Sequence, residues 1–281
     1  MIIICVILVL LLIMYIAIEM NSLQTTKYNI VSKKIPDNFD KYKILHLSDL
    51  HSKNFGKNNK RLLDKIYEIN PDIVIMSGDM VSSFDKNHGS FFIFIRELTK
   101  KYKVYYTLGN HEKHLMYFDL KEFKRNLKRC NVIVLDDKIA TIFRDDQSIN
   151  LYGFDYKSNM DLRVSNKKTD KKGYNIIFNT FGRPNKEEYN ILIAHDPSNY
   201  KIYDKWGADL TLSGHVHGGI IRFGKIGLLS PKRKFFPKYC IGKYEMNNSQ
   251  MIVSRGLGNS TLKLRIFNVP EIICITLHNN V

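Results

Sequence analysis

The chain has 281 residues, 44% of them hydrophobic, which is enough to bury one substantial core, so we expect a single globular domain. It has no low-complexity tract, which argues against a disordered chain. Its 43 Lys and Arg residues against 27 Asp and Glu residues give a formal charge of +16. That charge attracts nucleic acid, anionic lipid head groups and phosphorylated substrates alike, so it predicts only an anionic class of partner.

Residues 1–20 are expected to anchor the chain in a membrane. The run from Met1 to Ile18 is apolar apart from Tyr15, and at ~1.5 Å per residue such a helix approaches the ~30 Å hydrocarbon thickness. A cleaved signal peptide is disfavoured because no basic residue precedes Lys27 and Ala17-Ile18-Glu19 is a poor cleavage site. A buried core helix is disfavoured because no polar face interrupts the run.

The segment after the anchor, residues 21–42, is polar and Lys-bearing and is expected to be a linker before a catalytic domain over residues 43–281. Lys27, Lys33 and Lys34 favour a cytoplasmic domain by the positive-inside tendency. The bias is small, so we predict a single-pass protein of the cell membrane and leave the side of its catalytic domain open.

The first half of the domain alternates strands with helices. Residues 43–48 read as a strand, the apolar residues of 62–69 recur at helical spacing, and 73–76 is a β-branched strand. Further on we expect helices over 91–99 and 120–130, and strands over 103–108, 132–135, 140–143, 149–153, 190–194, 209–213, 250–254 and 271–277. The pattern predicts a layered α/β fold. The largely polar stretch 164–184 is expected to be a solvated loop.

Five short polar motifs follow predicted strands. They are Asp49-Leu-His51, Gly78-Asp79, Gly109-Asn110-His111-Glu112, His195-Asp196 and Gly214-His-Val-His-Gly-Gly219. Each alone is explained as a turn or a helix cap. Because strand carboxyl ends in a layered α/β sheet open onto a common crevice, residues distant in sequence converge there.

The donors in these motifs suit a transition metal. Four imidazoles with carboxylate and amide oxygens favour Mn, Fe, Zn, Ni or Co over Ca or Mg, which prefer oxygen ligands. Cysteine is absent from the motifs, which argues against a structural thiolate site. The donors exceed the four of a tetrahedral zinc site, and a carboxylate bridging two ions explains the surplus. The sequence therefore implies two divalent ions.

This ordered set resembles that of the calcineurin-like metallophosphoesterase family, whose pattern is D-x-H, GD, GN-H-[DE], H and GH-x-H. All five motifs match in order between about Lys43 and Leu277, and Ser254-Arg-Gly-Leu-Gly258 resembles a stretch of small bacterial membrane-associated members. The resemblance implies a layered α-β-β-α metallo-dependent phosphatase sandwich behind an N-terminal transmembrane helix.

The resemblance also implies a role for each motif residue. Asp49, His51 and His217 would bind one metal, Asp79 would bridge, and Asn110, His195 and His215 would bind the second. His111 would face the leaving group as general acid or transition-state stabiliser, with Glu112 or Asp49 orienting it. Two ions ~3.5 to 4 Å apart can lower the pKa of a bridging water, and the resulting hydroxide attacks phosphorus directly.

We therefore expect a hydrolase of phosphodiesters or phosphomonoesters, with manganese among the candidate metals and with membrane or lipid-linked substrates. We expect a monomer that contacts the membrane through its helix and has no specific nucleic-acid partner. Ile220 and Ser82 depart from the family's usual Gln and acid, which concerns substrate contacts rather than the metal ligands. The absence of a long insertion between the motifs suggests an open cleft for bulky substrates.

Two other classes stay open at this stage. A non-catalytic basic protein that binds membranes or nucleic acid would keep its binding after chelation and would hydrolyse no aryl phosphate ester. A metallohydrolase of another bond, such as an amide, would separate from a phosphoesterase when both substrate types are assayed side by side.

Overall fold

The computed structural model describes residues 2–117, 119–155, 170–219, 221–224, 226–228, 235–259 and 264–279. Two six-stranded sheets form its centre. The first has the order β1 (Gln24–Val31), β14 (Glu271–His278), β2 (Lys43–Leu47), β3 (Ile73–Met76), β4 (Lys103–Tyr106) and β5 (Val132–Val134). The second has the order β12 (Gly242–Met246), β13 (Ser249–Val253), β9 (Leu210–Ser213), β8 (Tyr189–Ala194), β7 (Gln147–Phe154) and β6 (Lys138–Arg144). A short pair, β10 (Arg222–Phe223) and β11 (Ile226–Gly227), lies outside both sheets.

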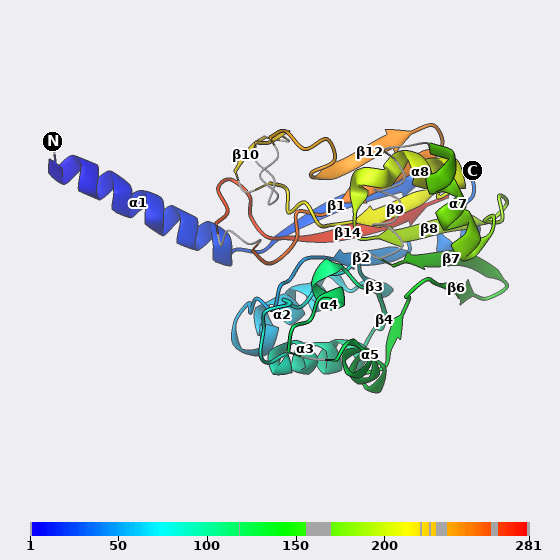
Figure 1. Ribbon diagram of the computed structural model, residues 1–281, viewed down its shortest axis with the longest axis horizontal. Helices are drawn as coiled ribbons and strands as arrows, with labels where there is room; N and C mark the ends of the chain where they lie inside the picture. Colours follow the sequence, from blue (N-terminus) through cyan, green and yellow to red (C-terminus); the bar gives the residue numbers. More distant parts are fainter. Residues whose placement is uncertain are drawn as a thin grey trace.

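Helices cover the outer face of each sheet (Figure 1). The helices beside the first sheet are α2 (Lys60–Ile69), α3 (Gly89–Thr99), α4 (Asn110–Lys113) and α5 (Leu120–Arg129). The second sheet carries α7 (Asp170–Phe181) and α8 (Tyr200–Trp206). Short 3₁₀ turns occur at η1 (Asp37–Phe39), η2 (Lys57–Asn59) and η3 (Pro197–Asn199). The architecture is the α-β-β-α sandwich expected from the sequence.

The hydrophobic core is divided into layers by the two sheets. Ile44 and Ile75 of the first sheet belong to one buried cluster with Ile193 and Leu212 of the second, so the sheets pack face to face. The alternating period of the strands directs these side chains inward, and the neighbouring residues face the helices. Leu62 and Ile66 of α2, four residues apart, are buried against the outer face of the first sheet, as the helical spacing predicts.

The expected linker over residues 21–42 is not a linker throughout. Residues 24–31 form β1, which pairs in parallel with β14 along eight residues, from Gln24 opposite Glu271 to Val31 opposite His278. The segment therefore completes the edge of the first sheet. Sequence periodicity did not indicate this strand because Ile30 is its only buried side chain.

The expected loop over 164–184 is also wrong in part. Residues 164–169 lie outside the described part of the chain, and residues 170–181 form α7. Tyr174, Ile177 and Phe181 recur at helical spacing and pack with Trp206 on the outer face of the second sheet. The burial of this stripe explains a helix where the charged composition indicated a loop.

Helix α1 (Ile2–Asn21) projects away from the sandwich (Figure 1). By length and composition it can cross a membrane, although a signal sequence has the same features. Its apolar side chains are exposed, Leu8 by 60% for example, so it is not a core helix of the domain.

Candidate metal centre

The motif residues gather at one edge of the sandwich. Strands β2, β3 and β4 are mutually parallel in the first sheet, and β8 and β9 are parallel in the second. The five motifs follow the carboxyl ends of these five strands, as the sequence predicted. Parallel strands bring their carboxyl ends to the same edge of a sheet, and the two edges meet here.

Asp49, His51 and His217 form the first group of donors. One donor atom from each lies within 4.8 Å of the other two. The Nε2 atoms of His51 and His217 are 3.1 Å apart, and Nε2 of His217 lies 3.4 Å from Oδ1 of Asp49. Asp49 is fully buried, and the backbone N–H of His215 donates to its carboxylate.

Asp79, His195 and His215 form the second group, whose donor atoms also lie within 4.8 Å of one another. Oδ2 of Asp79 is 3.1 Å from Nε2 of His195 and 4.0 Å from Nε2 of His51. One carboxylate oxygen is therefore close to a histidine of each group. Asn110 begins α4, and its Oδ1 is buried without a hydrogen-bond donor.

His111 lies beside the first group. Its ring contacts that of His51 edge-on at a centroid distance of 4.5 Å, and it forms a further donor group with His51 and Asp79. The backbone N–H of Ser83 donates to Nδ1 of His111 over 3.2 Å. Because Nδ1 accepts this bond, the hydrogen of the neutral ring is on Nε2.

Glu112 was one of two residues, with Asp49, that the resemblance offered to orient His111, and its carboxylate binds other groups instead. Its buried carboxylate accepts the backbone N–H groups of Asp79, Met80 and Val81 over 2.7–3.1 Å, together with that of Gly109 and the hydroxyl of Tyr106. Glu112 therefore joins the loops after β3 and β4. The group that binds the His111 ring is the backbone N–H of Ser83.

Most of the donor residues have an unusual backbone conformation. The donors with positive φ angles are Asp49 (52°), His51 (47°), Asp79 (55°), His215 (72°) and His217 (55°). Such conformations are uncommon outside glycine and cost free energy, so they persist only where the surrounding structure holds them. Their concentration in one site marks it as functional rather than as a set of ordinary turns.

Burial and mutual contacts shift the pKa values of the carboxylates and histidines of the site. Burial raises the pKa of Asp49 to about 6, against the opposing effect of His195. Burial acts in the same direction on Asp79, but the charge and hydrogen bond of His195 outweigh it and hold the pKa of Asp79 well below its usual range. Burial lowers the pKa of His51 to about 3 and that of His217 well below its usual range, so both rings are neutral with lone pairs to donate.

These residues fit divalent metal ions. Imidazoles, carboxylates and an amide oxygen are the donors that transition metals accept, and the imidazoles and carboxylates of the site converge within a few ångströms. Nδ1 of His217 and Oδ1 of Asn110 are buried without hydrogen-bond partners, a costly arrangement that is typical of a functional site.

Two residues that no sequence motif indicated, Arg265 and Asn268, support the site from the far end of the chain. The Asn268 amide donates to the backbone carbonyls of His217 and Gly219 over 2.7 and 2.6 Å. The buried Arg265 guanidinium donates to the carbonyls of Arg255, Gly256 and Gly258. Residues 256–258 in turn pack on Asp49, because the N–H of Gly258 donates to its carbonyl.

Gly109 allows the loop after β4 to pass against Asp79. A Cβ atom at this position would lie 2.2 Å from Oδ1 of Asp79 and 2.5 Å from its backbone nitrogen. We expect Gly109→Ala to displace Asp79 and to lower turnover by roughly 10²-fold, the cost of about 1 Å of misplacement. Gly89→Ala is the matched control, because its nearest atom is a flexible Asn87 oxygen at 3.0 Å. Equal turnover and metal content in the two variants would show that Asp79 does not depend on this contact.

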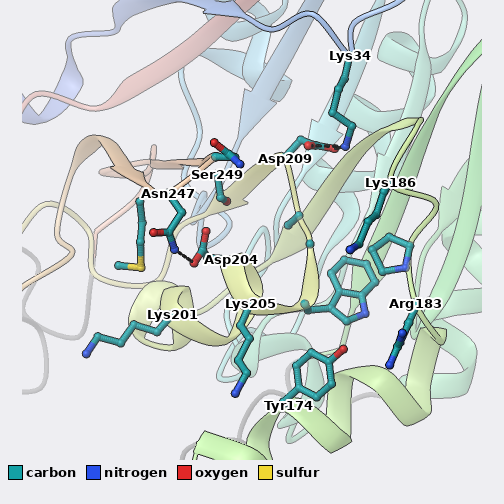
Figure 2. Close-up of a pocket in the computed structure, with 16 residues that line it drawn as sticks. Lys34, Tyr174, Arg183, Lys186, Lys201, Asp204, Lys205, Asp209, Asn247 and Ser249 are labelled. Atoms are coloured by element: carbon teal, nitrogen blue, oxygen red, sulfur yellow. Dashed lines mark hydrogen bonds and ion pairs between the residues drawn. The ribbon is translucent and has the colours of Figure 1, made fainter.

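A large cavity on the second sheet does not belong to this site (Figure 2). It has a volume of about 780 Å³ and lies beside α7 and α8, with several basic side chains around it. Lys34 pairs there with Asp209 over 2.7 Å. Asp209 precedes β9, whereas the metal donors follow it, so the cavity lies at the opposite end of that strand.

Comparisons with known proteins agree with this geometry. A family described as calcineurin-like phosphoesterase matches residues 42–219. The uncharacterized metallophosphoesterase YkuE of Bacillus subtilis is 28% identical over 266 residues, covering 92% of this chain and 87% of the relative. An uncharacterized metallophosphoesterase of Aquifex aeolicus is 26% identical over 271 residues, covering 94% and 95%. A Danio rerio transmembrane protein with a metallophosphoesterase domain is 25% identical over 253 residues, covering 87% of this chain and 55% of that protein.

The family match spans all five motifs, and the clustered donors supply the metal site that such an enzyme requires. The chain is a phosphoesterase that uses divalent metal ions, and it belongs to the calcineurin-like phosphoesterase family.

Proposed function

We propose that the chain hydrolyses phosphodiesters or phosphomonoesters at a centre of two divalent metal ions. The first ion would be held by Asp49, His51 and His217, and the second by Asn110, His195 and His215, with Asp79 shared. The observation that carries the proposal is the position of Oδ2 of Asp79, 3.1 Å from His195 in one group and 4.0 Å from His51 in the other. A shared carboxylate is what a two-metal site needs. Manganese is the first metal to test.

When bound, the ions would activate the attacking water and neutralise the phosphoryl oxygens. The chain itself supplies a hydrogen-bond donor for the leaving group. As the water oxygen bonds to phosphorus and the ester P–O bond breaks, the N–H at Nε2 of His111 would donate a hydrogen bond that stabilises the charge on the leaving oxygen, which takes its proton from solvent. Ser83 fixes this tautomer through its N–H bond to Nδ1.

His111→Ala is expected to keep the metal and to lower turnover about 10²- to 10³-fold, the range for loss of one hydrogen bond to a developing negative charge. Elemental analysis and initial rates on the same preparation check both parts. His278→Ala, at the end of β14, is the control and should leave turnover unchanged. Loss of metal from His111→Ala would instead make His111 a ligand, which its place in a donor group with His51 and Asp79 also permits.

We also propose that the enzyme acts at a membrane surface. The end of α1 is fixed to a loop of the site: Oε2 of Glu19 accepts the N–H of Phe267, and the rings of Tyr15 and Phe267 are 5.7 Å apart. The next residue, Asn268, holds the carbonyl of His217. A bilayer around α1 would therefore lie close to the metal centre, and lipid-linked phosphate esters could reach it. The name of the Danio rerio relative, which includes a transmembrane assignment, supports such an anchor.

In this proposal residues 1–20 are a single-pass anchor in the cell membrane, and the remaining chain is one catalytic domain that works as a monomer. The part of the expected linker that forms β1 belongs to that domain. The three lysines after α1 favour a cytoplasmic side by a small margin.

A substrate screen with added manganese tests the function. We expect aryl and lipid phosphoesters to be hydrolysed, hydrolysis to stop after chelation and to return with metal, and amides to be untouched. Hydrolysis of free nucleotides alone would contradict the proposal of membrane or lipid-linked substrates. Hydrolysis that survives chelation would contradict the proposed metal centre. Anion binding without any hydrolysis would favour a binding protein.

A further inference from the structure

A second cavity lies behind the histidine loop of the metal centre. It has a volume of about 770 Å³ and is lined by β1, the β10–β11 pair, β12 and the residues after β13; we call it the β1–β12 cavity. In Figure 1, β10 and β12 lie on one side of β1, away from α2 and α3. The lining residues that matter here are Gln24, Thr26, Tyr28, Arg222, Gly227, Arg255 and Glu271.

The loop that carries His215 and His217 packs against the wall of this cavity. A Cβ atom on Gly227 would lie 3.0 Å from the carbonyl oxygen of Gly218, the residue after His217. A Cβ atom on Gly218 would lie 2.7 Å from Cβ of Arg255, on the wall of the cavity. A ligand in the cavity would therefore contact Gly227 and Arg255, which pack against the loop that carries His215 and His217.

Arg222 brings an uncompensated charge to the cavity. Its Nε and Nη1 atoms are buried and have no hydrogen-bond partner. Burial lowers the pKa of Arg222 and the neighbouring Arg255 lowers it further, while Glu271 offsets these effects only in part. Charged donor atoms that are buried without acceptors are costly, and arginine presents a planar fork that matches a phosphate or a carboxylate.

The described lining of the cavity holds no carboxylate that is free to pair with Arg222. Glu271 is the only acid among the described residues that line the cavity. Its Oε2 lies 3.2 Å from Nε of Arg255 and accepts the hydroxyl of Thr26, and its Oε1 accepts the N–H of Arg255. Arg255 and Glu271 therefore compensate each other, and the charge of Arg222 is surplus.

We propose that the β1–β12 cavity is an anion-binding site in which Arg222 receives a phosphate or carboxylate group. Burial raises the pKa of Tyr28 to about 12, so its hydroxyl stays neutral beside the anion. Gln24 on the wall is three residues beyond the end of α1, so the head group of an anionic lipid can reach the cavity as readily as a soluble anion. The site is distinct from the metal centre and does not depend on which bond the enzyme cleaves.

Binding to the chelated full chain in an uncharged detergent tests the proposal. Chelation removes anion binding at the metals, so the remaining binding reports the cavity alone. Titration calorimetry with inorganic phosphate probes a soluble anion, and short-chain phosphatidylglycerol probes a lipid head group. We expect the native chain to bind one molecule of at least one probe and Arg222→Gln to bind it at least tenfold more weakly. Equal binding by the two proteins, or no binding of either probe to the native chain, overturns the proposal.

Two matched variants distinguish loss of the Arg222 site from a change in net charge and from misfolding. Arg96→Gln removes the same charge from an exposed position on α3 and should bind as the native chain does; an equal loss would overturn the proposal. Arg222→Lys keeps the charge without the planar fork, and we expect several-fold weaker binding even if Arg222→Gln does not fold. Unchanged affinity in Arg222→Lys would also count against an arginine site. Hydrolysis before chelation is scored separately, so failure of the enzyme function is not confused with failure of this site.

Discussion

Asp79→Asn is expected to abolish hydrolysis while the domain stays folded. The substitution keeps the shape of the side chain, and its Oδ1 can still accept the N–H of His111, which it does now over 2.7 Å. It removes the negative charge that both donor groups share. Changes to residues that only support metal ligands lower metal affinity about 10–100-fold. Loss of a ligand shared by both ions should therefore lower metal affinity at least ~10²-fold.

Metal content by elemental analysis, turnover and thermal unfolding together measure this result. Asp64→Asn on the exposed face of α2 is the control, because it removes the same charge from a surface pair with Lys60. It should keep metal and turnover, since surface pairs contribute little. Full metal content and turnover in Asp79→Asn would remove Asp79 from the centre of the proposal.

Glu112→Ala is expected to destabilise the domain severely. The native carboxylate accepts four backbone N–H groups in the loops that present Asp79 and Asn110, together with the hydroxyl of Tyr106 at the end of β4. A buried donor left without an acceptor costs about 1–3 kcal/mol, so the loss should exceed about 4 kcal/mol. That is a large fraction of the roughly 5–15 kcal/mol by which domains are stable.

Denaturant unfolding measures this free energy. Glu68→Ala on α2 is the matched control, since its side chain is exposed and pairs only with Lys65. It should change the free energy of unfolding by about 0.5 kcal/mol or less. If the two variants unfold at the same denaturant concentration, Glu112 does not hold the two loops together as the structure indicates.

The sequence predicted those parts of the fold that have a local cause. The strands before the five motifs are short apolar runs that end at glycine or at a polar residue, and they occur as β2, β3, β4, β8 and β9. The donor residues follow directly, so their meeting at one edge followed from the parallel order of the strands. The prediction of the five motifs and of the apolar N-terminal helix needed no tertiary information.

The parts that the sequence did not predict have tertiary causes. Strand β1 is formed by pairing with β14 from the other end of the chain, and its exposed, polar side chains carry no period. Arg265 and Asn268 bind backbone carbonyls, which no motif records. The family resemblance offered Glu112 or Asp49 as the residue that orients His111, but the buried Glu112 carboxylate accepts backbone N–H groups instead. Ile220, which was expected to depart from the family pattern, lies outside the described residues.

The most direct test of the two-metal proposal is elemental analysis of the purified, active chain. The proposal predicts two divalent transition-metal ions per chain, a parallel loss of metal and hydrolysis on chelation, and the return of both when manganese is added. An active preparation without a divalent transition metal, or with activity independent of its metal content, would contradict it.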